Sequence, residues 1–277
     1  MTAVTEPSRS GRRGLNLSLL LCFALMSVVI LCAIFRSSIA PDSPFTQRLE
    51  VGDKPPSAEF IAGTDLLGRD VLSRVIHGAR TALVGPIVVA AGAFAIATVL
   101  GLLSGYLGGW VDTVVMRWVD FMLALPGILV AIVVVGVVGG GYWTAVTVLI
   151  ILFTAPDTRI VRSTVLEQRP LPYIDAARSL GISKRRILFI HILPNILPLV
   201  LAYVALDFAF ALVNLAGLSF LGLGVEPGTP DWGRMLFENR NILFTNPLGL
   251  LLPAGMIILT AVSMNLIGDW LFERLTK

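Results

Sequence analysis

Charged residues are scarce in this chain. Asp, Glu, Lys and Arg make up 14% of its 277 residues, whereas 56% of the residues are hydrophobic, and the mean hydropathy is +0.84. A soluble globular domain usually carries about 25% charged residues. The composition therefore excludes an ordinary soluble protein and makes the lipid bilayer the expected solvent.

Lysine, histidine and cysteine are scarcer still. None of the three lysines follows a glycine, which excludes the Gly-Lys-Ser/Thr sequence of a phosphate-binding loop. The two histidines are predicted on opposite sides of the membrane, and both cysteines lie in the first apolar run, so no metal-ligand cluster is expected. Catalytic triads and cofactor motifs are also missing. We expect a chain that is no enzyme and holds no cofactor or metal itself.

Long uncharged runs are what the sequence has in abundance. About 20 apolar residues cross the hydrocarbon core as a helix. Five regions reach this length: 15–35, 81–111, 121–156, 196–223 and 246–267. The third is too long for one span, and its glycine triplet 139–141, followed by Tyr142 and Trp143, suits a turn at the membrane interface. Pro126 in the same region predicts a fixed kink. The predicted fold is all-α and integral to the membrane, with six transmembrane helices.

The basic residues predict the orientation of these helices. They gather in the tail 1–14, in the segment 159–186 and at the C-terminus, and the positive-inside rule places all three in the cytoplasm. The segment 36–80 carries six acidic residues beside its basic ones and is assigned to the outside. The run 15–35 is expected to be an uncleaved anchor, because it is longer than a signal-peptide core. The five-helix core then covers 81–277.

Two external segments and one cytoplasmic segment interrupt the spans. Residues 41–57 are irregular, and the helical spacing that follows predicts an amphipathic helix over 71–80 that lies in the interface. The loop 222–246 is rich in turn formers. On the cytoplasmic side, a short helix over 173–180 is interrupted at Gly181, and Ser183 begins a second helix that ends at Pro194.

The cytoplasmic segment resembles the EAA loop of ABC import permeases. Residues 173–181 read Tyr-Ile-Asp-Ala-Ala-Arg-Ser-Leu-Gly and continue to Ile-Leu-Pro-Asn at 192–195. Asp175 stands where the family usually has Glu. Further stretches make the resemblance more specific, to the C-type permease of bacterial dipeptide, oligopeptide and nickel importers. They are residues 63–80, 105–110, 218–224 and 230–233. Leu215 departs from this branch, which often carries an acidic residue there.

The resemblance implies an inner-membrane subunit that works with several partners. These are a homologous B-type permease, cytoplasmic ATPase subunits that bind ATP and Mg, an extracytoplasmic substrate-binding protein and the membrane lipid, with no nucleic acid. The segment 166–195 would couple the chain to the ATPase. Its implied coupling residues are Asp175, Ala176, Ala177, Arg178, Gly181, Lys184, Arg185, Arg186 and Pro194. The two alanines would allow close approach of the ATPase, and Gly181 would allow a bend. The basic residues would form ion pairs with acidic groups of the ATPase. Alternatively, the basic residues only orient the chain or bind anionic lipid.

Other candidate site residues lie within and outside the membrane. Asp207 is the one ionisable residue predicted deep in a span, and it either lines the translocation path or bonds a polar group such as Asn214. Candidates for an external interface are Asp65, Arg69, Asp70, Asp231 and Trp232.

Three alternatives to peptide import stay open at this point. The same architecture would suit import of nickel or another small solute. An ion-driven secondary transporter is a second alternative, although neither internal repeats nor broken helices are recognisable in the sequence. A membrane scaffold without a path is the third, and the buried Asp207 speaks against it.

Overall fold

The structure, a computed structural model, describes residues 11–275 and consists of helices joined by turns and loops. The first ten residues of the predicted basic tail lie outside the described residues, as does Lys277. No strand occurs between residues 11 and 275, so the all-α prediction is confirmed. The elements are α1 (Gly11–Ile39), α2 (Val71–Leu107), α3 (Gly109–Leu123), α4 (Gly127–Val138), α5 (Tyr142–Gln168), α6 (Pro172–Ser179), α7 (Lys184–Arg186), the π-helical turn η1 (Ile187–Ile192), α8 (Leu193–Phe220), α9 (Trp232–Glu238), the 3-10 turn η2 (Arg240–Ile242) and α10 (Leu248–Leu275).

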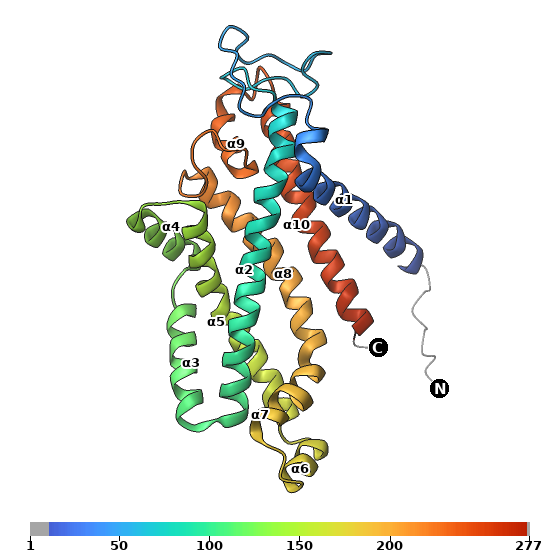
Figure 1. Ribbon diagram of the computed structural model, residues 1–277, viewed down its shortest axis with the longest axis vertical. Coiled ribbons are helices and arrows are strands. Elements are labelled where there is room, and N and C mark those ends of the chain that lie inside the picture. The colour runs from blue at the N-terminus through green and yellow to red at the C-terminus, as the bar shows by residue number, and fades with distance from the viewer. Residues whose placement is uncertain (1–10, 276–277) are drawn as a thin grey trace, which may run out of the picture.

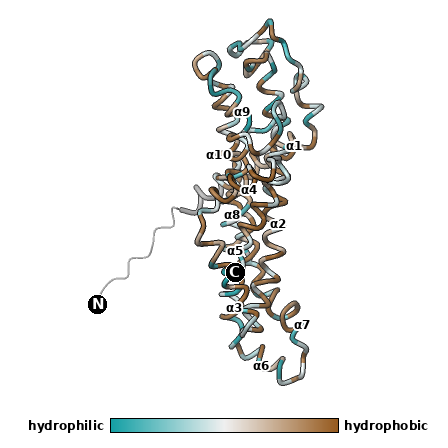
Figure 2. Tube along the Cα trace, turned by 90° about the vertical axis from the view of Figure 1, so that its left-hand side faces the viewer, coloured by the Kyte–Doolittle hydropathy of each residue, from teal (hydrophilic) through white to brown (hydrophobic). Residues whose placement is uncertain are grey.

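The long helices lie side by side in an elongated molecule, with α6 and α7 at one end and α9 at the other (Figure 1). Five helices are long and apolar enough to cross a membrane, and α3 with α4 gives a sixth span if the bent pair counts as one. Hydrophobic residues dominate the long helices, whereas hydrophilic ones gather in the loops near α9 (Figure 2). The predicted set of six spans agrees with this arrangement.

The third span differs from its prediction because it is broken rather than kinked. Helix α3 already begins at Gly109, and α4 leaves it at an angle of 87°. Pro126 lies at the break, where it lacks an N–H for the helical ladder and disfavours helical geometry at Leu125. The turn expected at 139–141 is present: Gly139 ends α4 in the left-handed region, and α5 begins at Tyr142.

The helix expected to lie in the interface over 71–80 is also different. These residues are the first turns of α2, which continues without interruption to Leu107. Asp70 caps the helix by accepting a hydrogen bond from the Ser73 N–H at 2.8 Å. The side chains of Ser73 and Arg74 are completely buried. Ser73 and Arg74 therefore face other parts of the protein, and the segment is the start of a long helix rather than a separate one.

Helices α2 and α5 approach each other closely because α2 carries two glycines one turn apart. A Cβ atom added to Gly101 would lie 2.6 Å from the Val161 Cβ, and one added to Gly105 would lie 2.8 Å from the Val165 Cβ. Small residues at this spacing allow membrane helices to pack backbone against side chain. The contact places α5 directly against α2 in the half of the molecule that leads to α6 (Figure 1).

We predict that replacing Gly101 and Gly105 with alanine lowers the thermal stability of the chain in lipid nanodiscs. Alanine is the better helix former by about 1 kcal/mol, but the added methyl groups overpack the contact with α5 at a cost of roughly 1–3 kcal/mol each. Gly255→Ala is the matched control, since no atom lies within 4 Å of its added Cβ. Equal melting temperatures for the double variant and the control would contradict the close packing.

Candidate coupling site and its polar surroundings

The segment predicted to couple the chain to an ATPase lies at the α6 end of the molecule (Figure 1). Pro172 occupies the first turn of α6, where its missing N–H costs nothing. Gly181 follows the helix with φ +73°. The Gly181 N–H donates to the Arg178 carbonyl at 2.9 Å, and the Ile182 N–H donates to the Ala177 carbonyl at 3.1 Å. These two bonds form a Schellman cap, so the bend predicted at Gly181 is present.

One face of α6 is anchored in an apolar cluster of its own chain. Ile174 is completely buried and Ala177 is 4% exposed. The cluster joins them to the ends of the neighbouring helices through Leu102, Tyr106, Val161, Val165, Ile187, Leu188, Ile192, Ile196 and Val200. Of the two alanines expected to allow close approach, Ala177 packs inside this cluster and Ala176 is exposed.

The other face of α6 is exposed and carries both polar and apolar groups. The Arg178 guanidinium lies over the Tyr106 ring at 5.3 Å and pairs with Asp175 at 3.2 Å. Its hydrogen bond to the Tyr106 hydroxyl is the main cause that raises the pKa of Arg178. Arg178 thus has partners within its own chain. Leu180 is 80% exposed. The sequence analysis did not single it out, although its place directly before Gly181, at the end of α6, was a signal for it.

The basic residues Lys184, Arg185 and Arg186 are exposed and form α7. Within the described part of the chain, no ion pair engages them. The second helix does not end at Pro194 as predicted, since η1 continues directly into α8. A π-helical turn has a wider ladder, which accommodates the missing N–H of Pro194. The Asn195 Nδ2 donates to the Tyr173 hydroxyl at 3.1 Å and so ties α8 to α6.

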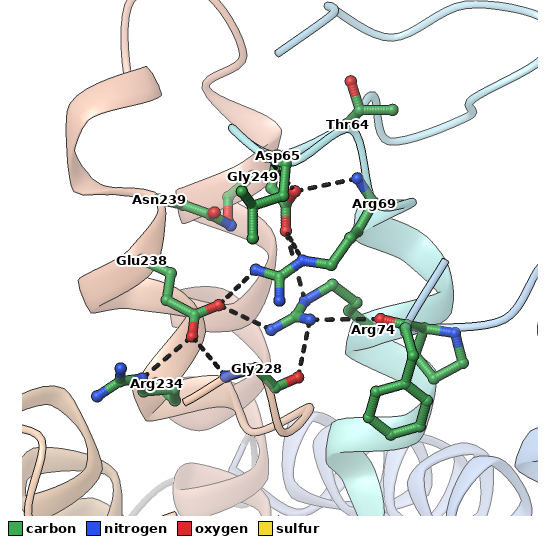
Figure 3. A network of polar contacts seen from close by, with 12 residues as sticks. Thr64, Asp65, Arg69, Arg74, Gly228, Arg234, Glu238, Asn239 and Gly249 are labelled. Atoms are coloured by element: carbon green, nitrogen blue, oxygen red, sulfur yellow. Dashed lines mark hydrogen bonds and ion pairs between the residues drawn. The ribbon is translucent and has the colours of Figure 1, made fainter. Parts of the chain in front are cut away.

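Residues expected at an external interface are instead buried at the α9 end. Exposure is 1% for Asp65, 4% for Arg69 and 3% for Asp70. The Arg69 Nε donates to the Asp65 carboxylate at 2.7 Å, and its Nη2 donates to the Glu238 carboxylate at 2.7 Å (Figure 3). Arg74 donates to the same Glu238 oxygen at 2.9 Å. These three residues therefore bond within their own chain, and their role at an external interface stays a prediction.

Glu238 joins three segments of the chain. Burial alone would raise the pKa of Glu238, but Arg74, the Gly228 N–H, Arg69 and Arg234 outweigh burial and lower it. The loop before α2, α2 itself and α9 all meet at this carboxylate (Figure 3). Nothing in the sequence pattern marked Glu238, because its partners Arg69 and Arg74 are more than 160 residues away along the chain.

Asp231 and Trp232 are buried in the same region. Asp231 caps α9 by accepting from the Arg234 N–H at 2.9 Å, and burial raises its pKa. The Trp232 indole donates to the Val75 carbonyl at 2.9 Å. Gly78 leaves room for the indole, since a Cβ there would lie 2.8 Å from the Trp232 Cδ1. Both residues hold α9 against α2, and their role at an external interface likewise stays a prediction.

The intramembrane candidate Asp207 faces a residue that the sequence reading missed. Asp207 is 8% exposed, and its carboxyl group interacts with that of Asp157 from α5. Asn214 does not pair with Asp207, because its Nδ2 donates to the Phe210 carbonyl at 2.8 Å. Asp157 was overlooked because it was assigned to the end of an apolar run, whereas α5 continues to Gln168. Leu215 is 4% exposed and lies in an apolar cluster.

Two arginines that the sequence reading used only for orientation connect α5 to α3. The Arg162 Nη2 donates to Asp112 at 2.7 Å, and Arg159 pairs with Asp120. Both pairs lie on the half of the broken span next to α2. They hold α3 against α5.

We predict that Ile174→Ala loosens α6 from the ends of the spanning helices. Removing a completely buried isoleucine costs about 2–5 kcal/mol in well-packed cores. Amide hydrogen exchange of residues 173–180 should therefore become faster than in the wild type, with the spanning helices unchanged. Leu180→Ala is the control, because Leu180 is 80% exposed. Equal exchange in the two variants would contradict the anchoring of α6.

Comparisons with known proteins were consistent with this geometry. The model of the family described as "Binding-protein-dependent transport system inner membrane component" matches residues 97–277. The dipeptide transport system permease protein DppC of Alkalihalophilus pseudofirmus is 38% identical over 256 residues, which cover 91% of this chain and 83% of the relative. The glutathione transport system permease protein GsiD of Pectobacterium atrosepticum is 40% identical over 228 residues, which cover 82% of this chain and 75% of the relative.

Among solved structures, the MetNI methionine ABC transporter in an inward-facing conformation is similar in fold. The TM-score is 0.59 at 17% sequence identity, and the match covers 73% of this chain and 96% of the other. The family match begins at residue 97, near the C-terminal end of α2, and extends over all later elements, including the coupling segment. The chain therefore belongs to the inner-membrane components of binding-protein-dependent transport systems, a family of multi-pass transport permeases rather than known enzymes.

Proposed function

We propose that this chain is the permease subunit of an ATP-driven importer of di- and oligopeptides. It forms half of the translocation path with a homologous permease, while cytoplasmic ATPase subunits bind ATP and Mg. An extracytoplasmic binding protein delivers the cargo to the α9 end, and both termini lie in the cytoplasm. The relatives named for dipeptide and glutathione transport favour peptides over nickel as cargo.

The observation that carries this proposal is the two-sided character of α6. Ile174 fixes one face of the helix to the spanning helices, while the other face presents Ala176 and the 80% exposed Leu180. Lys184, Arg185 and Arg186 extend this exposed surface. An exposed apolar side chain next to a small residue and unpaired positive charges suits a cleft with an apolar floor and an acidic rim. An ATPase subunit would provide that cleft.

The anchoring of α6 explains how force reaches the membrane. Its apolar cluster includes residues from α2, α5, η1 and α8, so a displacement of α6 moves the ends of these helices together. Alternating access follows if ATP binding pulls the coupling surfaces of the two permeases toward each other and hydrolysis releases them. Asp175, Arg178 and Tyr106 keep the exposed face of α6 in one orientation.

We predict that Gly181→Pro abolishes ATP-driven peptide uptake in proteoliposomes that hold the assembled transporter. Proline requires a negative φ and has no N–H, whereas Gly181 has φ +73° and donates to the Arg178 carbonyl. Gly181→Asn is the matched control, because asparagine tolerates the left-handed region, and it should retain most of the uptake. Charge reversal of Arg185 and Arg186 to Glu should likewise reduce uptake.

The readouts separate coupling from assembly. Loss of uptake in subunits that stay assembled and still hydrolyse ATP is the expected result for Gly181→Pro. Wild-type uptake in both Gly181→Pro and the charge-reversed variant would overturn the assignment of the coupling surface. Uptake by this chain without an ATPase subunit would favour an ion-driven transporter instead.

A further inference from the structure

Two carboxyl groups meet between α5 and α8 with no hydrogen-bond donor to separate them. Asp157 is 7% exposed and Asp207 is 8% exposed, and their side chains interact directly. The Asp157 Oδ2 is buried and has no hydrogen-bond partner among residues 11–275. An ionised carboxylate only accepts hydrogen bonds. The pair therefore lacks one positively charged or donating species.

A small cavity lies beside the pair. The cavity has a volume of about 10 Å³, and both aspartates line it. This is room for about one water molecule. The unpartnered Asp157 oxygen and the cavity thus point independently to a ligand of very small size.

We propose that Asp157 and Asp207 form a proton-binding site, in which one proton held between the two carboxyl groups joins α5 to α8. Two adjacent carboxylates in a water-poor interior cannot both ionise without a large electrostatic cost. One shared proton removes this repulsion and creates an O–H···O⁻ hydrogen bond, which is stronger than a neutral one.

The surroundings favour a proton over a metal cation. From α2 the cavity is lined by Phe94 and Ala97, and from α5 by Ile160 and Val161 in addition to Asp157. Helix α8 contributes Val200, Tyr203 and Val204 beside Asp207. Tyr203 is the only further titratable group of this lining. Hard cations such as Mg²⁺ and Ca²⁺ require six or more oxygen ligands, which two carboxyl groups and one hydroxyl do not supply.

Nearby charged groups on the packed helices are engaged elsewhere or lie outside the cavity. Arg159 and Arg162 of α5 are paired with Asp120 and Asp112 of α3. Asp269 of α10 lines a separate groove on the other side of Tyr203. No lysine or arginine lines the cavity itself, so no basic side chain neutralises the pair from within.

The position of the site connects it to the coupling segment. Helix α5 enters that segment and α8 leaves it, so the shared proton ties together the two spanning helices that flank α6. Loss of the proton places two like charges between these helices and pushes them apart. The role of the site in coupling rests on the proposed function. The presence of the proton does not, and it can be tested without an ATPase.

The test is infrared spectroscopy of the full chain in lipid nanodiscs at neutral pH, which requires no ATPase and no cargo. The carbonyl stretching band of a protonated carboxylic acid should be present in the wild type. The part of the band that belongs to the pair should be lost in Asp157→Asn and in Asp207→Asn, because the amide donates to the remaining carboxylate. Asp269→Asn is the matched control, since Asp269 is exposed, and it should keep the band. Two single variants protect the test against a folding failure of either one.

Two results would overturn the proposal. One is a protonated band that keeps its full wild-type intensity in both single variants, which would assign the acid to another residue. The other is a wild type without the band whose melting temperature falls when sodium is replaced by choline, which would make the pair a cation site.

Discussion

The close contact between α2 and α5 is the constraint on which the rest of the structure depends. Gly101 and Gly105 leave no side chain between the helices, so Val161 and Val165 pack against the backbone of α2. Helix–helix association in a bilayer gains little from the hydrophobic effect and relies on such close packing. The contact fixes the spacing of two helices whose ends carry α6, and it brings Leu102 and Tyr106 into reach of Ile174.

Each end of α2 helps to hold an arginine side chain in place, but one of these arginines is buried and the other is exposed. At the α9 end, Arg74 is fully buried and is neutralised by Glu238, while Arg69 bridges Glu238 and Asp65. Buried charges persist only when they are paired and hydrogen-bonded. At the α6 end, Tyr106 supports Arg178 on an exposed surface. One helix therefore connects a rigid polar cap with the surface proposed to receive force.

Most of the helical architecture could be predicted from local sequence patterns, because hydrophobicity and backbone preference act over short stretches of the chain. Long apolar runs predicted the spans, and the glycine triplet predicted the turn before α5. The Gly181 bend was recognisable because glycine is the residue that most easily ends a helix in the left-handed region. These features depend on residues close together in the sequence, where periodicity and backbone preference decide the outcome.

What the sequence did not predict are contacts between distant segments. Asp65, Arg69 and Trp232 looked like surface residues because polar and aromatic side chains in loops are usually exposed, and Glu238 was not recognised as the partner of Arg69 and Arg74. Asp157 looked like the end of a span until α5 was seen to continue past it. The 87° break after α3 lies at Pro126, and the ion pairs that join α3 to Arg159 and Arg162 of α5 were not predicted either. Such pairings are set by tertiary packing and carry no local signal.

The central claim is that the exposed face of α6 is the surface that meets an ATPase. Cysteine cross-linking tests it most directly, in a chain whose two free cysteines, Cys22 and Cys32, are replaced by alanine. Leu180→Cys should cross-link to single cysteines in the ATPase cleft. Phe244→Cys, which is 97% exposed at the opposite end, should not. A Leu180→Cys chain that assembles with the ATPase but forms no cross-link anywhere in its cleft would contradict the account.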